Sequence, residues 1–221
     1  MSAGTNRGIL GAIAIAAVIS LAINVLRLCG ELNEWNATLF NPAGGGGFSP
    51  LGITWLVPVF GFWFGRRLAS DGHGPRSAGI AAASAVLGFA LAGGVAYLVF
   101  GTELLAAKED IATKTAIAFP GVAVCGLVLL KAWPRAWTAL ALYGALARAP
   151  VLVIQHLAFA RGWHTHFNNG GKNGPADPAV LNRVLTIAEG VFWPFGFTVL
   201  VGGLFAAIGA ATVRRDGGQV A

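Results

Sequence analysis

The sequence has few charged residues and few cysteines. Only 11% of its 221 residues are charged, whereas a soluble domain is about a quarter charged. Its two cysteines, Cys29 and Cys125, form no C-x-x-C pair, which excludes a disulfide-stapled scaffold and a dithiol redox motif. Polar side chains are also too few to cover a water-soluble globule, so that class of protein is excluded.

The sequence motifs of several enzyme classes are missing. There is no G-x-x-x-x-G-K-S/T phosphate loop, no H-E-x-x-H zinc motif and no Gly-x-Ser-Gly nucleophile of rhomboid-like serine proteases. His156 is the only histidine within an apolar run, so two histidines cannot hold a b-type haem between membrane helices. The sequence therefore does not support these particular motif-based activities.

Long apolar runs dominate what is present. Hydrophobic residues make up 56% of the chain, and the mean hydropathy is +0.69. Six runs approach the ~20 residues with which a helix crosses a membrane core of roughly 30 Å, and none alternates as a barrel strand would. We predict an all-α, polytopic integral membrane protein, a single domain over 1–221. Its six transmembrane helices, in a compact bundle, are expected at 8–29, 51–65, 78–100, 113–130, 136–160 and 190–211.

Basic residues predict the orientation of this bundle. The segments assigned to the cytoplasmic side carry eight basic residues against two acids, Asp71 and Asp216. Basic cytoplasmic connections are typical of membrane proteins, so both termini are expected inside, in a bacterial inner (cytoplasmic) membrane. The same bias explains the net charge of +6 without a nucleic-acid partner. The eight residues are Arg7, Arg66, Arg67, Arg76, Lys131, Arg135, Arg214 and Arg215.

A polar stripe runs along the first predicted helix. Ser20, Asn24, Arg27, Glu31 and Glu34 follow one another at steps of three or four residues, which places them on one helix face. Arg27 and Glu31 stand at i, i+4 and can pair. A solvated helix end with a snorkelling arginine explains Glu34, but it does not explain Asn24, which is expected within the hydrocarbon.

Arg148 lies near the middle of the fifth run, two residues before Pro150. Inserting an arginine at this depth of the membrane costs at least about 3 kcal/mol of free energy, so the side chain is expected to have polar partners. Gln155 shares its helix face, seven residues on. The functional interpretation is an anion-binding residue, and the alternative is a structural ion pair with Glu189 or Glu31. The candidate substrate-binding residues are Asn24, Arg27, Glu31, Arg148, Gln155 and Glu189.

Three histidines follow or end the fifth run. His164 and His166 form a His-x-His pair, and His156 precedes them. Glu31, Glu34 and Glu189 are expected at the same level of the membrane. Three histidines with one of these carboxylates are a donor set for zinc, copper or iron. The alternative is that the histidines lie at the membrane interface and bond water and backbone.

Small residues recur at four-residue spacing in two predicted helices, as Ser84, Gly88, Ala92 and as Gly202, Ala206, Ala210. Such stripes allow close helix packing, here favoured inside the bundle over a homodimer face. Residues 178–188 are expected to form a separate amphipathic helix at the surface. Trp193 is assigned to the aromatic belt at the outer interface.

These polar residues are expected to converge at the outer side, between the first, fifth and sixth helices. We favour a protein that binds or transports a small, anionic solute there. One alternative is a membrane-embedded enzyme with a divalent metal on His156, His164 and His166, and another is a non-catalytic subunit of a membrane complex. The expected partners are the lipid bilayer, a small molecule, and further copies or a larger complex.

Overall fold

The computed structural model describes residues 3–43, 51–102, 110–171 and 174–213. Within these ranges the chain is helical and forms no strand, which confirms the predicted all-α class. Five helical stretches are long and apolar enough to cross a membrane, so the expectation of an integral membrane protein is supported. They are Gly8–Leu32, Ala78–Phe100, Ile111–Ala132, Pro134–Arg161 and Pro178–Ala211.

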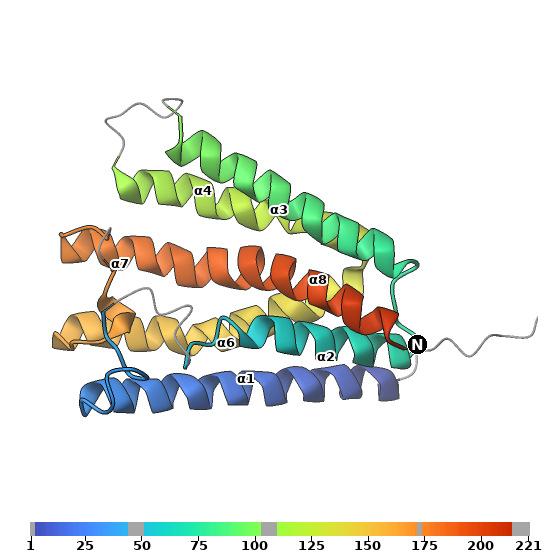
Figure 1. The fold of residues 1–221 in the computed structure, drawn as a ribbon, viewed down its shortest axis with the longest axis horizontal. Coiled ribbons are helices and arrows are strands. Elements are labelled where there is room, and N and C mark those ends of the chain that lie inside the picture. The colour runs from blue at the N-terminus through green and yellow to red at the C-terminus, as the bar shows by residue number, and fades with distance from the viewer. Residues whose placement is uncertain (1–2, 44–50, 103–109, 172–173, 214–221) are drawn as a thin grey trace, which may run out of the picture.

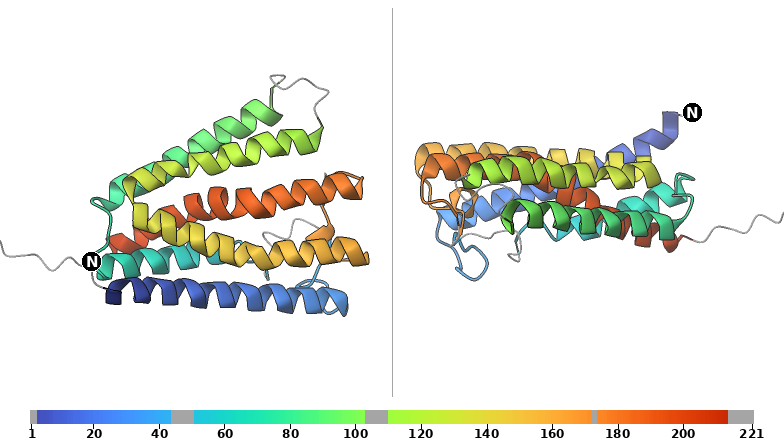
Figure 2. Two further views of the ribbon diagram at one scale, coloured as in Figure 1. Left: turned by 180° about the vertical axis from the view of Figure 1, so that it is seen from behind. Right: turned by 90° about the horizontal axis from the view of Figure 1, so that it is seen from above.

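The helices lie side by side along the long axis of the molecule (Figure 1), and α1 begins at the same end at which α8 finishes. The α3–α4 hairpin lies along one side and diverges from the other helices toward its loop (Figures 1 and 2). The elements are α1 (Ala3–Leu32), α2 (Leu56–Ser70), α3 (Ala78–Phe100), α4 (Ile111–Cys125), α5 (Leu127–Ala132), α6 (Pro134–Arg161), the 3-10 turn η2 (His166–Asn168), α7 (Pro178–Ile187), the π-helix η3 (Ala188–Phe197) and α8 (Thr198–Ala211).

The surface is apolar over much of its area. Val18 on α1 is 64% exposed, and Ile80 and Tyr97 on α3 are 63% and 66% exposed. Soluble monomers rarely expose contiguous apolar patches larger than a few hundred Å². A helix surface of this kind suits lipid, where apolar side chains need no cover.

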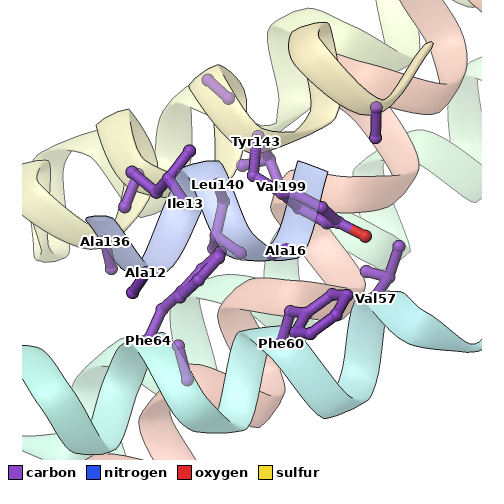
Figure 3. Packing of buried hydrophobic residues seen from close by; sticks show 14 of the residues in the cluster. Ala12, Ile13, Ala16, Val57, Phe60, Phe64, Ala136, Leu140, Tyr143 and Val199 are labelled. Carbon is purple, nitrogen blue, oxygen red and sulfur yellow. The ribbon is translucent and has the colours of Figure 1, made fainter. Parts of the chain in front are cut away.

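The buried core lies between α1, α2, α6 and α8 (Figure 3). The ring of Tyr143 makes edge-to-face contacts with Phe60 and Phe64, with centroids 5.4 and 5.6 Å apart. The Tyr143 hydroxyl is 3.0 Å from the hydroxyl of Ser20 on α1. This hydrogen bond connects Ser20, the first residue of the polar stripe on α1, to Tyr143 of α6.

The second helix lies later in the chain than predicted. The expected span was 51–65, whereas α2 covers Leu56–Ser70. Residues 51–55 form a turn instead, with Leu56 N–H donating to the carbonyl of Ile53. The helix continues through Arg66 and Arg67 because arginine is a good helix former whose charge reaches out at a membrane edge. It ends before Gly72, whose φ of 74° is favourable only for glycine.

Residues 178–188 do not form a separate surface helix, which corrects the prediction. They are the start of one continuous helical stretch, Pro178–Ala211, so the last membrane-length segment begins twelve residues before the predicted 190. Asp177 caps it by accepting from the N–H of Ala179 at 2.8 Å. The amphipathic pattern arises because one face of α7 packs on the bundle, where Leu181 is buried.

Glycines bring α2 and α8 together. A Cβ on Gly65 would overlap the backbone of Ala206, and one on Gly61 would lie 2.5 Å from the carbonyl oxygen of Gly202. The Gly202–Ala206 stripe therefore packs inside the bundle, and Gly88 and Ala92 of α3 are also buried. Close packing of small residues takes the place of a hydrophobic driving force in lipid.

We expect Gly65→Ala to lower the free energy of unfolding by about 1–3 kcal/mol, because the two backbones must separate. Thermal unfolding in detergent, followed by circular dichroism, measures this. Gly11→Ala is the matched control, since a Cβ there meets nothing within 4 Å and should stabilise the helix slightly. Equal midpoints for the two variants would contradict close α2–α8 packing.

Candidate functional site

A polar cavity of about 320 Å³ lies between α1, α6, α7 and η3. The turn at 52–54 and the segment between α6 and α7 complete its wall. It is partly open and combines apolar with charged lining. The lining residues are Asn24, Arg27, Gly52, Ile53, Thr54, Arg148, Val151, Gln155, His166, Phe167, Asn169, Gly170, Leu185, Glu189 and Trp193.

Arg148, on α6, contacts two side chains of η3. Its Nη1 lies 2.8 Å from Oε2 of Glu189, and its guanidinium stacks over the Trp193 ring at 4.7 Å from the centroid. Both the ion pair and the cation–π contact offset the loss of water around a side chain that is 7% exposed. Glu189 and Trp193 are four residues apart, so one helix face presents both.

The close approach of α6 and η3 has a local cause. A Cβ on Gly144 would lie 2.7 Å from the carbonyl oxygen of Pro194, so only glycine allows the two backbones to come this near. Arg148 follows Gly144 by one helical turn and meets Glu189. η3 is a π-helix, a conformation that occurs frequently at functional sites.

On the α1 side, Glu31 connects three groups. Its carboxylate accepts from Arg27 Nε at 2.8 Å, from the backbone N–H of His166 at 2.9 Å and from the His166 ring, whose Nδ1 is 2.7 Å away. Arg27 also donates to the carbonyl oxygen of Asn41 at 3.4 Å. Glu31 therefore ties α1 to the segment that walls the cavity.

Gln155 closes the cavity next to α7. Its amide nitrogen donates to Oδ1 of Asn182 at 2.8 Å and to the hydroxyl of Thr186 at 3.1 Å. This arrangement leaves the amide oxygen for other contacts. The pair Gln155–Asn182 extends the antiparallel register of Arg148–Glu189 along the two helices.

Four buried polar atoms of cavity-lining residues make no hydrogen bond within the part of the chain that the structure describes. They are Asn24 Nδ2, Thr54 Oγ1, Arg148 Nη2 and Gln155 Oε1. Their residues are between 1% and 7% exposed. Leaving such an atom unpaired costs about 1–3 kcal/mol, and all four belong to residues that line the same cavity.

The structure places the sequence-predicted residues as follows. Asn24, Arg27, Arg148, Gln155 and Glu189 line the cavity together. Glu31 is not among the lining residues, but its carboxylate contacts two of them, Arg27 and His166. Of the two acids proposed as partners of Arg148, Glu189 is the one in contact.

The three histidines predicted as metal ligands do not meet in the described structure. His156 is exposed, and its Nδ1 lies 2.8 Å from its own helix carbonyl at Leu152. His164 is exposed, whereas His166 turns inward to Glu31. No group of three His, Cys, Asp or Glu is placed to hold a metal ion among the residues described. The metal hypothesis therefore gains no support.

Sequence reasoning missed several parts of the wall. Thr54 falls within the predicted span 51–65, whereas in the structure it belongs to the turn at residues 51–55 and lines the cavity. Trp193 was assigned to the membrane interface but stacks on Arg148. Its spacing of four from Glu189 was the available signal. Phe167 and Asn169 belong to an irregular segment that periodicity does not describe.

Comparisons with known proteins identify no relative: no family model, curated protein or solved structure matches the chain.

We expect Glu31→Gln to destabilise the fold by about 3–5 kcal/mol, because it removes the carboxylate from a buried Arg27 guanidinium. Denaturation in mixed micelles of increasing SDS content measures the free energy of unfolding. Glu34→Gln is the control, since Glu34 is exposed. A loss no greater than that of the control would show that the Glu31 contacts contribute little.

Acidification should also destabilise the protein through His166, which lies outside the membrane-length helices. Burial lowers the pKa of the His166 ring from 6.5, although the Glu31 carboxylate acts in the opposite direction. Below about pH 6.5 the unfolded chain binds this proton more readily than the folded one, so the free energy of unfolding falls as pH decreases. Unfolding midpoints between pH 7.5 and 5.5 measure the slope.

His166→Asn should flatten this pH dependence, and His164→Asn, at an exposed position, should leave it unchanged. Identical slopes in the two variants would contradict the assignment to His166.

Proposed function

We propose that this chain is a membrane protein that binds a small anionic solute in the polar cavity and transports it. The observation that carries the proposal is the set of four unpaired buried polar atoms around the cavity. Three of them, on Asn24, Thr54 and Arg148, can donate hydrogen bonds, and Gln155 Oε1 accepts. An excess of donors favours a solute rich in acceptor atoms, such as a carboxylate.

An unpaired nitrogen of the guanidinium supports an anion at Arg148 in particular. Glu189 engages Nη1 of the guanidinium, whereas Nη2 is among the unpaired atoms. An anionic group there would gain a charge-assisted hydrogen bond without displacing Glu189. The volume of about 320 Å³ is at the lower end of ligand pockets, which favours a compact solute.

Transport is supported by irregular backbone next to the cavity. Pro150 lies inside α6, Pro194 lies inside the π-helix η3, and residues 52–54 are not helical. Nonhelical backbone beside a polar site, here residues 52–54, is typical of transporters, in which it lines the substrate path.

We further propose six membrane crossings with both termini in the cytoplasm of a bacterial inner membrane. In this arrangement α2 is the crossing that adds to the five membrane-length stretches. Its fifteen residues span about 22 Å, and the turn at 51–55 completes the crossing. The basic residues Arg66, Arg67 and Lys131 then lie on the cytoplasmic side, and the cavity opens on the other side. The protein acts alone or with further copies.

The test is the thermal unfolding of purified protein in detergent with the sodium salts of acetate, lactate, succinate and phosphate, and with neutral glycerol. We expect at least one of the anions to raise the unfolding midpoint saturably. Arg148→Lys should weaken that anion's apparent affinity about tenfold or more, since lysine cannot copy the planar fork of the guanidinium.

Arg161→Lys is the matched control, because Arg161 ends the same helix but is exposed. If glycerol stabilises the protein as well as every anion, or if Arg148→Lys binds as tightly as the control, the anion site is refuted. Flux of the stabilising anion into proteoliposomes then separates transport from binding alone.

A further inference from the structure

An apolar groove of about 380 Å³ lies far from the polar cavity, toward the end of the bundle at which α1 and α6 begin. Ile9, Leu10 and Ile13 of α1 form one wall, and Ala139 and Leu142 of α6 form the other. The first turns of α1 diverge from the neighbouring helices at this end of the bundle (Figure 2, right).

The groove opens on the lipid-facing surface. Leu10 and Leu142 are 52% and 38% exposed, whereas Ile13 and Ala139 at its base are buried. Since these are membrane-length helices, what surrounds the groove is lipid. An apolar groove between helices accepts a hydrocarbon chain, whereas a hydrated ion would lose its water there without gaining polar contacts.

Arg135, the second residue of α6, lines the end of the groove and is half-buried. It forms no ion pair or hydrogen bond within the described ranges. Arg67 of α2 does not line the groove, but it lies close to the first turns of α1: a Cβ on Gly8 would lie 2.8 Å from its Nη2. Asp71, 3.2 Å from Arg67 Nε, is the one acidic residue described at this end of the bundle.

An apolar groove that ends at Arg135 complements one kind of membrane molecule. Phospholipids with a net negative charge carry acyl chains below a phosphate, and basic pockets between transmembrane helices bind such headgroups. A zwitterionic lipid fills the channel equally well but gains less from the positive charge.

We propose that this groove is a binding site for one anionic phospholipid, with an acyl chain between α1 and α6 and its phosphate at Arg135. The lipid would fill the space that α1 leaves open and so fix the position of its first turns. The site is independent of the solute cavity, so either proposal can fail without the other.

Native mass spectrometry of the purified full chain, titrated with dioleoylphosphatidylglycerol or dioleoylphosphatidylcholine, tests the proposal. We expect one phosphatidylglycerol to bind at least fivefold more tightly than phosphatidylcholine. Arg135→Gln should weaken phosphatidylglycerol about fivefold and leave phosphatidylcholine unchanged. Lys131→Gln, an exposed basic residue outside the groove, is the matched control and should bind like the wild type.

A second variant tests the apolar part of the groove. Thr138 is exposed and lines it, so Thr138→Trp should fill the channel and abolish tight binding of phosphatidylglycerol while the far-ultraviolet circular dichroism stays unchanged. Glycerol 3-phosphate, the soluble headgroup alone, should not compete.

Four results would overturn the proposal: equal affinity for the two lipids, an equal loss in Arg135→Gln and Lys131→Gln, full binding by a folded Thr138→Trp, or competition by glycerol 3-phosphate. The last would identify a site for free phosphate instead.

Discussion

Two buried guanidinium groups constrain how this membrane bundle can pack. Arg27 and Arg148 are 2% and 7% exposed, and the desolvation of such a charge costs several kcal/mol. The partners that offset this cost come from different parts of the chain, Glu31 beside Arg27 and Glu189 opposite Arg148. Because these contacts require short distances, the Arg148–Glu189 pair fixes η3 relative to α6. Glu31 lies on the same helix as Arg27, and its contacts with His166 tie α1 to the segment that follows α6.

Two of the irregular backbone segments lie beside the polar groups. The turn at 52–54 and the π-helix η3 both line the cavity, while α3 is regular over its full length. Nonhelical backbone is tolerated at membrane depth only beside protein or water. Glycines at 61, 65 and 144 then let α2 meet α8 and α6 meet η3 without intervening side chains. The proposed solute site is thus lined by the turn at 52–54 and by the π-helix η3, two departures from regular α-helix.

The parts of this site that follow helical periodicity could be predicted from the sequence. The spacing of Asn24, Arg27 and Glu31 placed them on one face, and the depth of Arg148 marked it as a residue in need of partners. The choice of Glu189 over Glu31 as that partner depends on helix register, which no local pattern specifies.

Other features depended on tertiary packing. Residues 51–55 look like part of an apolar helix, but in the structure they form the turn that carries Thr54. Residues 178–188 look amphipathic because one face packs on the bundle, and their continuity with α8 could not be told from a surface helix. The His-x-His pair suggested a metal site, yet His166 turns to Glu31 and His164 faces outward.

The central claim is that the cavity is polar and reachable by water within an apolar bundle. Its most direct measurement is the labelling rate of cysteines at two positions of α6, in a background without Cys29 and Cys125, by a charged, membrane-impermeant thiosulfonate. Val151 lines the cavity but is 5% exposed, whereas Val153 faces outward and is 61% exposed. We expect Val151→Cys to react faster than Val153→Cys, because a thiol in lipid seldom ionises or meets the reagent. Faster labelling of Val153→Cys, or none at Val151→Cys, would contradict it.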